Sequence, residues 1–357
     1  MVFKINPFHQ LLWRTPETMQ IGVGRNRLIL ENVSPAQERF IDSLYYGVPE
    51  AQLAALAKQA GLSTTEATNL VDRLRPALTA DAPAADSRTA DAGPVAKPEI
   101  IRASLDHQAT GIGMIAKRRG AAIHLDRLDP SGLTLLLSLA AAGIGSFTTR
   151  DNSRVTVDDI ASNVYPRSLL GQYRHAAAKL ILDSSWPGAR LLYTNRGNDK
   201  KTARVDLAVL THHQVTSPSQ VSAWRTMSVP VIEIRYQPDG FEVSPVLTEF
   251  SGCLVCRDHF KQDLDDCHLV LCAQLLSSDL RFDDAASRLL ACGLATQQIL
   301  DFLDRGTHSA AEQVEFRYYR EDGRGLGGGT RLEAKAWKAH PRCGCQITAS
   351  SVLNVAS

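Results

Sequence analysis

Two short cysteine pairs are the residues best suited to chemistry in this chain. Cys253 and Cys256 are separated by two residues, and Cys343 and Cys345 are separated by one residue near the C-terminus. Four thiolates in two close pairs match the tetrahedral sulfur ligation of Zn²⁺, and such a closed site leaves no open position for water or substrate. We therefore expect a structural zinc ion that holds the C-terminal segment against the middle of the chain.

Histidines near these pairs are alternative metal ligands. His259 follows the first pair and His340 precedes the second, so either imidazole could replace a thiolate, although four cysteines suffice. His212 and His213 end a strand-like segment elsewhere in the chain. Because adjacent side chains of a strand point to opposite faces, we expect these two histidines not to share one site.

Composition limits the classes of protein to consider. The chain has 357 residues, 44% of them hydrophobic and 22% charged, which favours a globular protein of two domains. A net charge of +1 gives no basic footprint for nucleic acid, and there is no apolar run long enough for a membrane span. The N-terminus lacks the features of a signal peptide. We expect a cytoplasmic protein in which the three remaining cysteines are ordinary reduced thiols.

One segment of low complexity divides the chain. Residues 80–98 are rich in Ala, Asp and Pro and hold almost no large apolar side chain, so they predict a flexible linker. We expect a small N-terminal domain at 1–79 and a larger domain at 99–357.

The N-terminal domain has the outline of a winged helix. Strand-like segments at 3–23 and 26–31 precede three predicted helices. The first begins at Ser34 and Pro35 and stops at Gly47. The second runs from Pro49 to Gly61, and Ser63 or Thr64 caps the third.

Two functions suit such a domain. DNA binding needs cations on the third helix, and Lys and Arg are nearly absent there before Arg73. The alternative is capture of an extended peptide as an added strand, with side chains inserted toward the third helix. The residues predicted to bind such a peptide are Arg27, Leu28, Ile29, Leu30 and Glu31 of the strand, and Thr65, Asn69 and Leu70 of the third helix.

The larger domain alternates strand-like and helix-like segments. Residues 119–125, 146–149, 191–194, 205–211 and 229–235 favour strands, and 133–142 and 173–182 favour helices. Such alternation predicts an α/β fold with a mostly parallel sheet and helices on both faces.

Several motifs in this domain resemble one protein family. The segment Leu139 to Gly145 with Asp151 resembles the ThiF-like, or Rossmann-like, nucleotide-binding domain of ubiquitin-activating type. The segments 241–259 and 337–345, which carry the cysteine pairs, are similar to the leader-peptide-binding partner proteins of azole-forming ribosomal peptide biosynthesis. The resemblance implies a winged-helix recognition element joined to a ThiF-like domain with a four-cysteine zinc site.

The chain departs from that family pattern at the phosphate loop. Gly132 fits the third glycine, but Arg127 and Asp129 stand where the first two glycines are expected. A carboxylate beside phosphate oxygens is repulsive, by about 1–4 kcal/mol at ~4 Å, and Pro130 removes an amide donor. Asp151 persists at the position that binds ribose. We therefore expect no ATP binding and no catalytic residues.

The resemblance implies a non-catalytic subunit. Its expected partners are the leader of a ribosomal precursor peptide and a YcaO-type cyclodehydratase that forms azolines, and a homodimer is also expected from the family. Two alternatives stay open: an ATP-dependent adenylating enzyme, and a zinc-stabilised winged-helix regulator that binds DNA.

Overall fold

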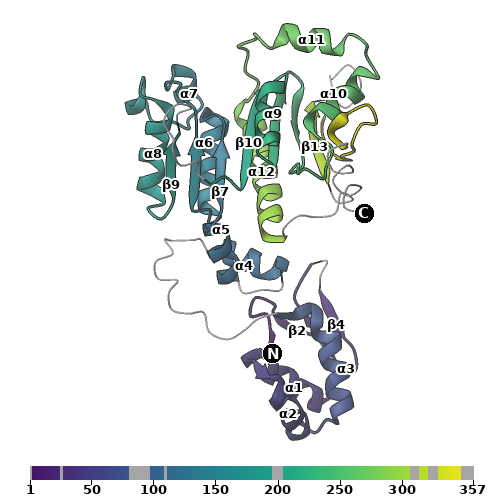
Figure 1. Cartoon of the computed structure of the whole chain (residues 1–357). Coiled ribbons are helices and arrows are strands. Elements are labelled where there is room, and N and C mark those ends of the chain that lie inside the picture. The colour runs from purple at the N-terminus through teal and green to yellow at the C-terminus, as the bar shows by residue number, and fades with distance from the viewer. Residues whose placement is uncertain are drawn as a thin grey trace, which may run out of the picture. The chain divides into compact units, whose positions relative to one another are not determined.

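The computed structural model describes residues 2–24, 27–79, 97–107, 111–194, 204–305, 313–320 and 329–346. Contacts divide the chain into two compact units, Met1–Lys117 and Arg118–Ser357 (Figure 1). Most of the predicted linker lies outside the described residues, and its last two residues begin helix α4 (Lys97–His107). The domain bounds 1–79, 80–98 and 99–357 stay a prediction.

Two small antiparallel sheets make up the strands of the N-terminal unit. In one, β1 (Val2–Ile5) lies between β5 (Val48–Pro49) and β6 (Leu78–Thr79). In the other, β2 (Leu11–Thr15), β3 (Thr18–Ile21) and β4 (Leu28–Leu30) follow one another in order. Strand β4 therefore ends this sheet.

Three helices of this unit begin and end close to the predicted residues. Ser34 caps α1 (Pro35–Tyr46) by accepting a hydrogen bond from the Gln37 amide. Ser63 caps α3 (Thr64–Leu74) in the same way, with Glu66 completing a capping box. The second prediction was wrong at its start: Pro49 lies in β5, and α2 (Leu53–Ala60) follows a short 3₁₀ turn. Pairing of β5 with β1 keeps the backbone extended at that position.

One hydrophobic core holds the N-terminal unit together. It joins the inner faces of all three helices to the strands, with Phe40, Leu44, Leu70 and Leu74 among its buried members. Helix α4 is connected to the same unit because the Asn6 side chain donates a hydrogen bond of 3.0 Å to the Ser104 carbonyl. Three helices beside a three-stranded antiparallel sheet are compatible with a winged helix, and that assignment stays a prediction.

The C-terminal unit is built on one eight-stranded sheet of order β14-β13-β12-β11-β10-β7-β8-β9. Strands β7 (Ala122–Leu125), β8 (Ser146–Thr149), β9 (Arg190–Tyr193), β10 (Leu207–His213) and β11 (Val231–Gln237) are parallel to one another. Strands β12 (Gly240–Val243), β13 (Val314–Arg320) and β14 (Thr330–Ala336) continue it in antiparallel fashion. The sheet is therefore mixed. The parallel pattern predicted from sequence covers its first five strands in chain order, β7 to β11.

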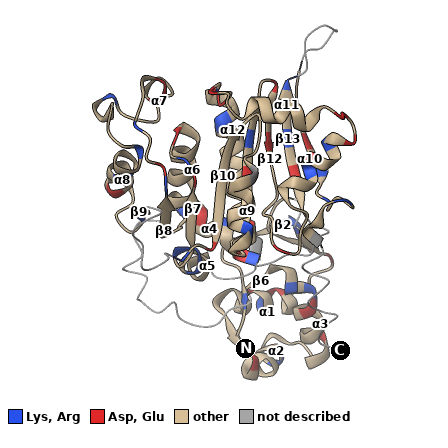
Figure 2. Cartoon of the chain, turned by 45° about the horizontal axis from the view of Figure 1, so that its top comes forward, with Lys and Arg blue, Asp and Glu red and all other residues tan. Residues whose placement is uncertain are grey.

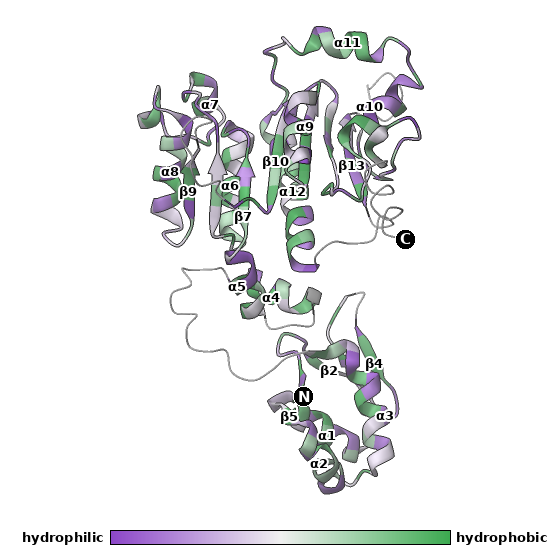
Figure 3. Ribbon diagram, viewed as in Figure 1, coloured by the Kyte–Doolittle hydropathy of each residue, from purple (hydrophilic) through white to green (hydrophobic). Residues whose placement is uncertain are grey.

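Helices cover both faces of this sheet, as the alternation predicted. Helices α6 (Pro130–Ala141), α8 (Arg174–Ser185) and α12 (Ala285–Arg305) bury the larger core on one face. Helices α9 (Pro218–Thr226) and α10 (Leu254–Gln262) lie on the other face. Strand β10 is buried on both sides and is drawn mostly green in Figure 3. The unit also holds α7 (Val157–Ala161) and α11 (His268–Leu275).

A buried ion pair fixes the C-terminal end of α12. Arg118 lies at the end of α5 (Gly111–Arg119) and is 3% exposed. Its Nη2 lies 2.6 Å from Oδ2 of Asp304, and its Nη1 donates to the Ala142 carbonyl. Removing one partner of such a pair leaves an uncompensated buried charge, which is much more destabilising than replacing both partners by apolar side chains.

We predict that Asp304→Ala lowers the free energy of unfolding by about 3–5 kcal/mol, because the Arg118 charge then stays buried without its partner. The double variant Arg118→Met/Asp304→Leu is expected to regain most of that loss. Asp301→Ala, one turn earlier and partly exposed, serves as the control and changes stability by less than about 1 kcal/mol. Denaturant unfolding of the full chain measures all three. A loss below 1 kcal/mol in Asp304→Ala contradicts the prediction.

Candidate functional site

The four predicted metal-binding cysteines come together in space. The Sγ atom of Cys253 lies 3.8 Å from that of Cys256 and 3.6 Å from that of Cys343, and the Cys256 and Cys345 sulfurs are 3.4 Å apart. All four sulfur atoms lie within 4.8 Å of one another. A tetrahedral ion with bonds of about 2.3 Å needs sulfur–sulfur edges of about 3.8 Å, whereas a disulfide needs about 2.05 Å. The donor set fits a closed, structural metal site.

Two segments far apart in the sequence supply these sulfurs. Cys253 precedes the first residue of α10 and Cys256 lies in its first turn, while Cys345 lies in a 3₁₀ turn at Gly344–Gln346. The Trp337 indole donates a hydrogen bond of 2.9 Å to the Gly252 carbonyl. A Cβ atom at Gly252 would lie only 2.7 Å from the Lys338 carbonyl oxygen. Glycine thus allows the terminal segment to approach the start of α10 closely enough to share an ion.

The thiols of the cluster affect one another's protonation. A hydrogen bond from the Cys256 thiol lowers the pKa of Cys253, and the same contact raises the pKa of Cys256. Ligation of a metal ion requires thiolates. The Arg225 guanidinium donates to the Cys345 carbonyl at 2.7 Å, which places a positive charge beside the sulfurs.

The two neighbouring histidines act outside the sulfur cluster. His340 places Nε2 2.8 Å from Asp263 Oδ2, and its Nδ1 accepts a hydrogen bond from the Arg342 amide. Both ring nitrogens of His340 are thus engaged, while the His259 ring stacks on it at 5.2 Å. These contacts stabilise the terminal segment and leave the ligand positions to the cysteines.

The predicted nucleotide loop lies at the point of the sheet where the strand order reverses. It follows β7, which is flanked by β8 on one side and β10 on the other, and ligands of such sheets bind at the carboxyl ends of the strands at this point. Asp129 is fully buried there, and its carboxylate accepts a hydrogen bond from the Gly132 amide to cap α6. The helix N-terminus that would face a phosphate is therefore already paired with an acid of the chain itself.

The other loop residues also serve the protein's own structure. Asp151 accepts hydrogen bonds from the Leu128 amide at 2.7 Å and the Ser153 amide at 2.8 Å, so its carboxylate secures the loop. A Cβ atom at Gly132 would lie 1.9 Å from the Arg127 carbonyl oxygen. That glycine is required by the packing of the loop. Asp129, Asp151 and Gly132 are thus all engaged in the loop's own structure.

The segment between α11 and α12 reaches the same strand ends. The Phe282 amide donates to His213 Nδ1, Ser131 donates to Asp283 Oδ2 at 3.0 Å, and Arg281 contacts Asp159. This segment therefore connects the ends of β10, α6 and α7. Sequence patterns gave no sign of it, because its residues act through partners more than 60 positions away.

His212 and His213 lie on opposite faces of the sheet, as predicted. His212 contacts Glu233 at 2.9 Å and Gln220 of α9 at 2.8 Å on one face. His213 stacks on Tyr236 on the other face. The two side chains therefore belong to different environments and do not form one site.

The residues predicted to bind a peptide divide by burial. Leu30 and Leu70 are 1% and 3% exposed and belong to the core of the N-terminal unit. Arg27, Glu31, Thr65 and Asn69 are exposed, and Leu28 and Ile29 are half-buried on the terminal strand β4. The two leucines can act only by supporting the neighbouring surface, and peptide binding by the other six residues stays a prediction.

A charged sheet face under α10 was not predicted from the sequence. This charged sheet face consists of side chains that four neighbouring strands direct to the same side of the sheet. They are Glu233 and Arg235 of β11, Glu242 of β12, Glu315 and Arg317 of β13, and Glu333 and Lys335 of β14. Cross-strand neighbours pair Arg235 with Glu242, Glu242 with Arg317, and Arg317 with Glu333, so the charges alternate. Figure 2 shows red and blue close together around α10, β12 and β13.

Helix α10 supplies the opposite side of this network. Nη2 of Arg257 lies 2.6 Å from Oε2 of Glu233, and Lys261 Nζ lies 3.3 Å from Oε1 of Glu242. Burial alone would raise the pKa of Glu233, yet the Arg257 guanidinium and the hydrogen bond to His212 hold it well below its usual range. The signal in the sequence was the alternation of charged and apolar residues in these strands, which is also typical of a half-exposed strand.

Within the described part of the chain, no helix is both long enough and apolar enough to cross a membrane.

We predict that Cys345→Ala releases the metal and lowers Tm by on the order of 10 °C, since structural ions of this kind contribute several kcal/mol to folding. Metal analysis of the protein as purified and thermal unfolding of the full chain give the two readouts. Cys267→Ala removes an exposed thiol outside the cluster and is the matched control. A wild-type protein that holds no metal after purification under reducing conditions, or a Cys345→Ala variant with unchanged metal content, contradicts the assignment.

A second prediction concerns Asp126, which follows β7 and accepts a hydrogen bond from the Thr211 amide. Burial raises the pKa of Asp126 to about 7, against the lowering effects of His212 and Arg127. Because the folded-state pKa exceeds the unfolded value, this carboxyl contributes stability at low pH that is lost between about pH 4 and pH 7. Asp126→Asn should match the wild type below pH 4 and be more stable, by a few kcal/mol, above pH 7. Equal stability of both proteins at pH 8 would show that the carboxyl is not perturbed.

No protein-family model matches the chain, and no curated protein sequence matches it. Among solved structures, E. coli MccB with AMPCPP and selenomethionyl MccA superposes with a TM-score of 0.69 at 14% identity, covering 96% of this chain and 99% of that one. E. coli MccB with ATP gives a TM-score of 0.67 at 15% identity, covering 97% and 99%.

A second protein, PaaA, has a similar structure. The structure of PaaA has a TM-score of 0.64 at 15% identity and covers 93% of this chain and 99% of that one. MccB is described as a microcin C7 biosynthetic enzyme and has been solved with N-formylated MccA. At these identities the likeness establishes architecture and nothing finer. This chain therefore has the α/β fold of MccB over nearly its whole length.

Proposed function

We propose that this chain is a non-catalytic subunit of ribosomal peptide biosynthesis. In this proposal it binds the leader of a precursor peptide and presents the remaining peptide to a YcaO-type cyclodehydratase, which forms azoline or azole rings. Zn²⁺ is the ion proposed for the four cysteines, because a set of four thiolates with closed geometry is typical of structural zinc. A cytoplasmic location and a homodimer belong to the same proposal.

The observation that carries the proposal is the buried carboxylate of Asp129. It occupies the N-terminus of α6, where a phosphate of a nucleotide would otherwise be bound. Asp151, the residue expected at the ribose, holds the Leu128 amide instead. These contacts engage both carboxylates with backbone amides of the chain itself, which supports a binding role over an adenylating one.

The N-terminal unit offers an edge for peptide capture. Strand β4 pairs with β3 and, among the described residues, with no strand on its other side. An added peptide strand would gain affinity from main-chain hydrogen bonds and register from side-chain contacts. Tethering the precursor near a partner enzyme raises its effective concentration into the millimolar range for a short flexible connection. No direct chemistry by this chain is needed for such a role.

A second candidate is an ATP-dependent enzyme that modifies a peptide. The fold match favours it, because MccB has been solved with ATP and with MccA. The two candidates differ in one measurable property, nucleotide binding by the isolated chain. Titration with Mg-ATP separates them: binding with pyrophosphate exchange supports the enzyme, and its absence supports the non-catalytic subunit.

The test of the proposal uses a synthetic leader peptide, encoded by a short Cys-, Ser- and Thr-rich reading frame next to this gene. We expect the full chain to bind it with a Kd near 1 µM, or roughly −8 kcal/mol. N-methylation of alternate leader residues removes main-chain donors. Only one of the two alternate sets faces β4, so methylating that set should weaken binding at least tenfold and methylating the other should not.

Three results would contradict the proposal. The first is a genomic neighbourhood that lacks both a precursor gene and a YcaO-type gene. The second is equal loss of affinity with either set of methylated peptides, which would exclude strand addition. The third is turnover of ATP by the chain alone.

A further inference from the structure

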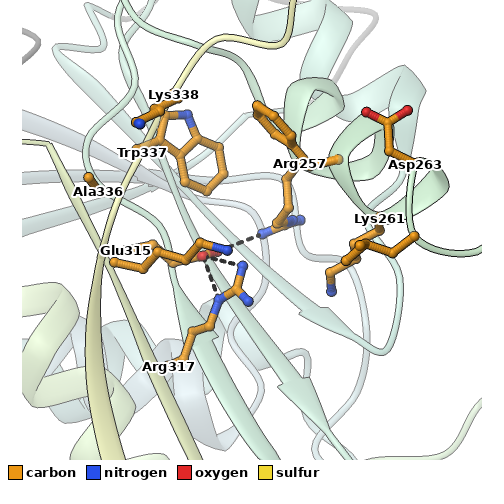
Figure 4. A pocket seen from close by; sticks show the side chains of 11 residues that line it. Arg257, Lys261, Asp263, Glu315, Arg317, Ala336, Trp337 and Lys338 are labelled. Carbon is orange, nitrogen blue, oxygen red and sulfur yellow. Dashed lines mark hydrogen bonds and ion pairs between the residues drawn. The ribbon is translucent and has the colours of Figure 1, made fainter.

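A cavity of about 450 Å³ opens between α10, β13 and β14 in the C-terminal unit (Figure 4). Its volume falls in the range of small-molecule sites. The charged sheet face forms its floor through Glu315 and Arg317, and Arg257 and Lys261 of α10 form one wall. The proposed functions assign no role to this cavity, which lies at the opposite end of the sheet order from β7 and β8.

Cations outnumber acids in the lining of this cavity. The five cations are Arg257, Lys261, Arg317, Lys335 and Lys338, and the two acids are Asp263 and Glu315. Asp263 is already paired with His340 and Arg342 of the terminal segment. The lining alone would therefore attract an anion.

Ion pairs account for three of the five cations in the cavity lining. Arg257, Lys261 and Arg317 each have a carboxylate partner at 2.6–3.3 Å. Lys335 and Lys338 are exposed at the rim and have no carboxylate at ion-pair distance among the described residues. The two lysines thus leave about two positive charges uncompensated at the rim, which favours an anionic ligand.

Arg257 adds a buried donor that lacks a partner. The residue is 4% exposed, yet its Nε and Nη1 atoms have no hydrogen-bond partner among the described residues. The carboxylates nearest to Nη1, those of Glu242 and Glu315, lie 3.9 Å away. Buried donors are almost always paired, so this open guanidinium edge indicates a missing acceptor. Figure 4 shows the guanidinium directed into the cavity.

The remaining lining is apolar. Trp337, Phe260 and Leu264 contribute it, and Trp337 is held in place by its hydrogen bond to Gly252. A ligand would thus meet cations on one side and aromatic surface on the other. Arginine recognises carboxylates through paired hydrogen bonds, and aromatic side chains bind a neighbouring apolar group.

We infer that this cavity binds a carboxylate that has an aromatic or large aliphatic group close to it in the same molecule. Either the C-terminal residue of a peptide or a free amphipathic acid supplies that chemistry. The carboxylate pairs with Arg257, Lys335 and Lys338, and the apolar group lies against Trp337. The inference does not depend on leader capture by the N-terminal unit or on the state of the nucleotide loop.

Isothermal titration of the full chain with N-acetylphenylalanine tests the inference. We expect a Kd on the order of 1 mM, with the corresponding amide at least tenfold weaker because it lacks the charge. A tetrapeptide acid ending in phenylalanine distinguishes the two sources. Tighter binding of the tetrapeptide than of N-acetylphenylalanine identifies a peptide end, and tighter binding of the single residue identifies a free acid.

Variants at the rim provide the matched comparison. Lys335→Gln/Lys338→Gln should weaken binding roughly tenfold, because each lysine supplies a charged donor. Lys179→Gln, on the exposed surface of α8, is expected to leave binding unchanged. Thermal unfolding and metal content confirm that each variant is folded. Lys335→Glu/Lys338→Glu should abolish binding.

Four results overturn the inference. One is the absence of any binding by N-acetylphenylalanine, and another is equal binding of the acid and its amide. The third is unchanged affinity in the Lys335→Glu/Lys338→Glu variant. Tighter binding of phenyl phosphate than of N-acetylphenylalanine also overturns it, since the site would then select phosphate.

Discussion

The contact between the start of α10 and the terminal segment is the constraint on which the C-terminal unit depends. Apolar burial holds α6 and α12 against the sheet, because their inner faces carry leucine, alanine and isoleucine. Helix α10 faces glutamate and arginine instead, through Arg257 and Lys261. The desolvation free energy of buried charges exceeds the stabilisation that hydrophobic contacts provide there, unless the charges are paired. In the proposed metal site, sulfur ligation fixes the start of the helix independently of that balance.

That arrangement explains why a charged surface can exist inside this protein. The acids and cations of the charged sheet face alternate between neighbouring strands, so each has an opposite charge beside it. The helix that covers them need not be apolar, because the cysteines anchor one end of it and the Asp263 contacts with His340 and Arg342 anchor the other. A polar cavity can then form at the margin, with donors that the protein itself does not satisfy.

Local signals in the sequence predicted what depends on local physics. Serine caps, a proline at the first helical position and a glycine in the left-handed region mark helix ends through backbone hydrogen bonds, and α1 and α3 begin where they predict. The cysteine spacing predicted the sulfur cluster, because the residue types allow few other uses. The predicted helix start at Pro49 was wrong because the backbone there pairs with β1, and no local sequence signal indicates pairing with a distant strand.

The rest of the site depends on distant partners. Asp151 could be placed after a strand from the sequence, but its hydrogen bond to the Leu128 amide follows only from the fold. Leu70 is a different case, because helical periodicity alone places it on the inner face of α3, where it belongs to the core, although it was predicted to bind a peptide. The antiparallel order of strands β12 to β14 and the charges they share follow only from the three-dimensional structure.

The close approach at Gly252 has a consequence for how this protein can diverge. No side chain fits between that residue and the Lys338 carbonyl oxygen. The restriction exists only while the terminal segment is in place. A descendant that lost its last twenty or so residues would be free to vary at position 252, so glycine there and the distal sulfur pair should be inherited or discarded together.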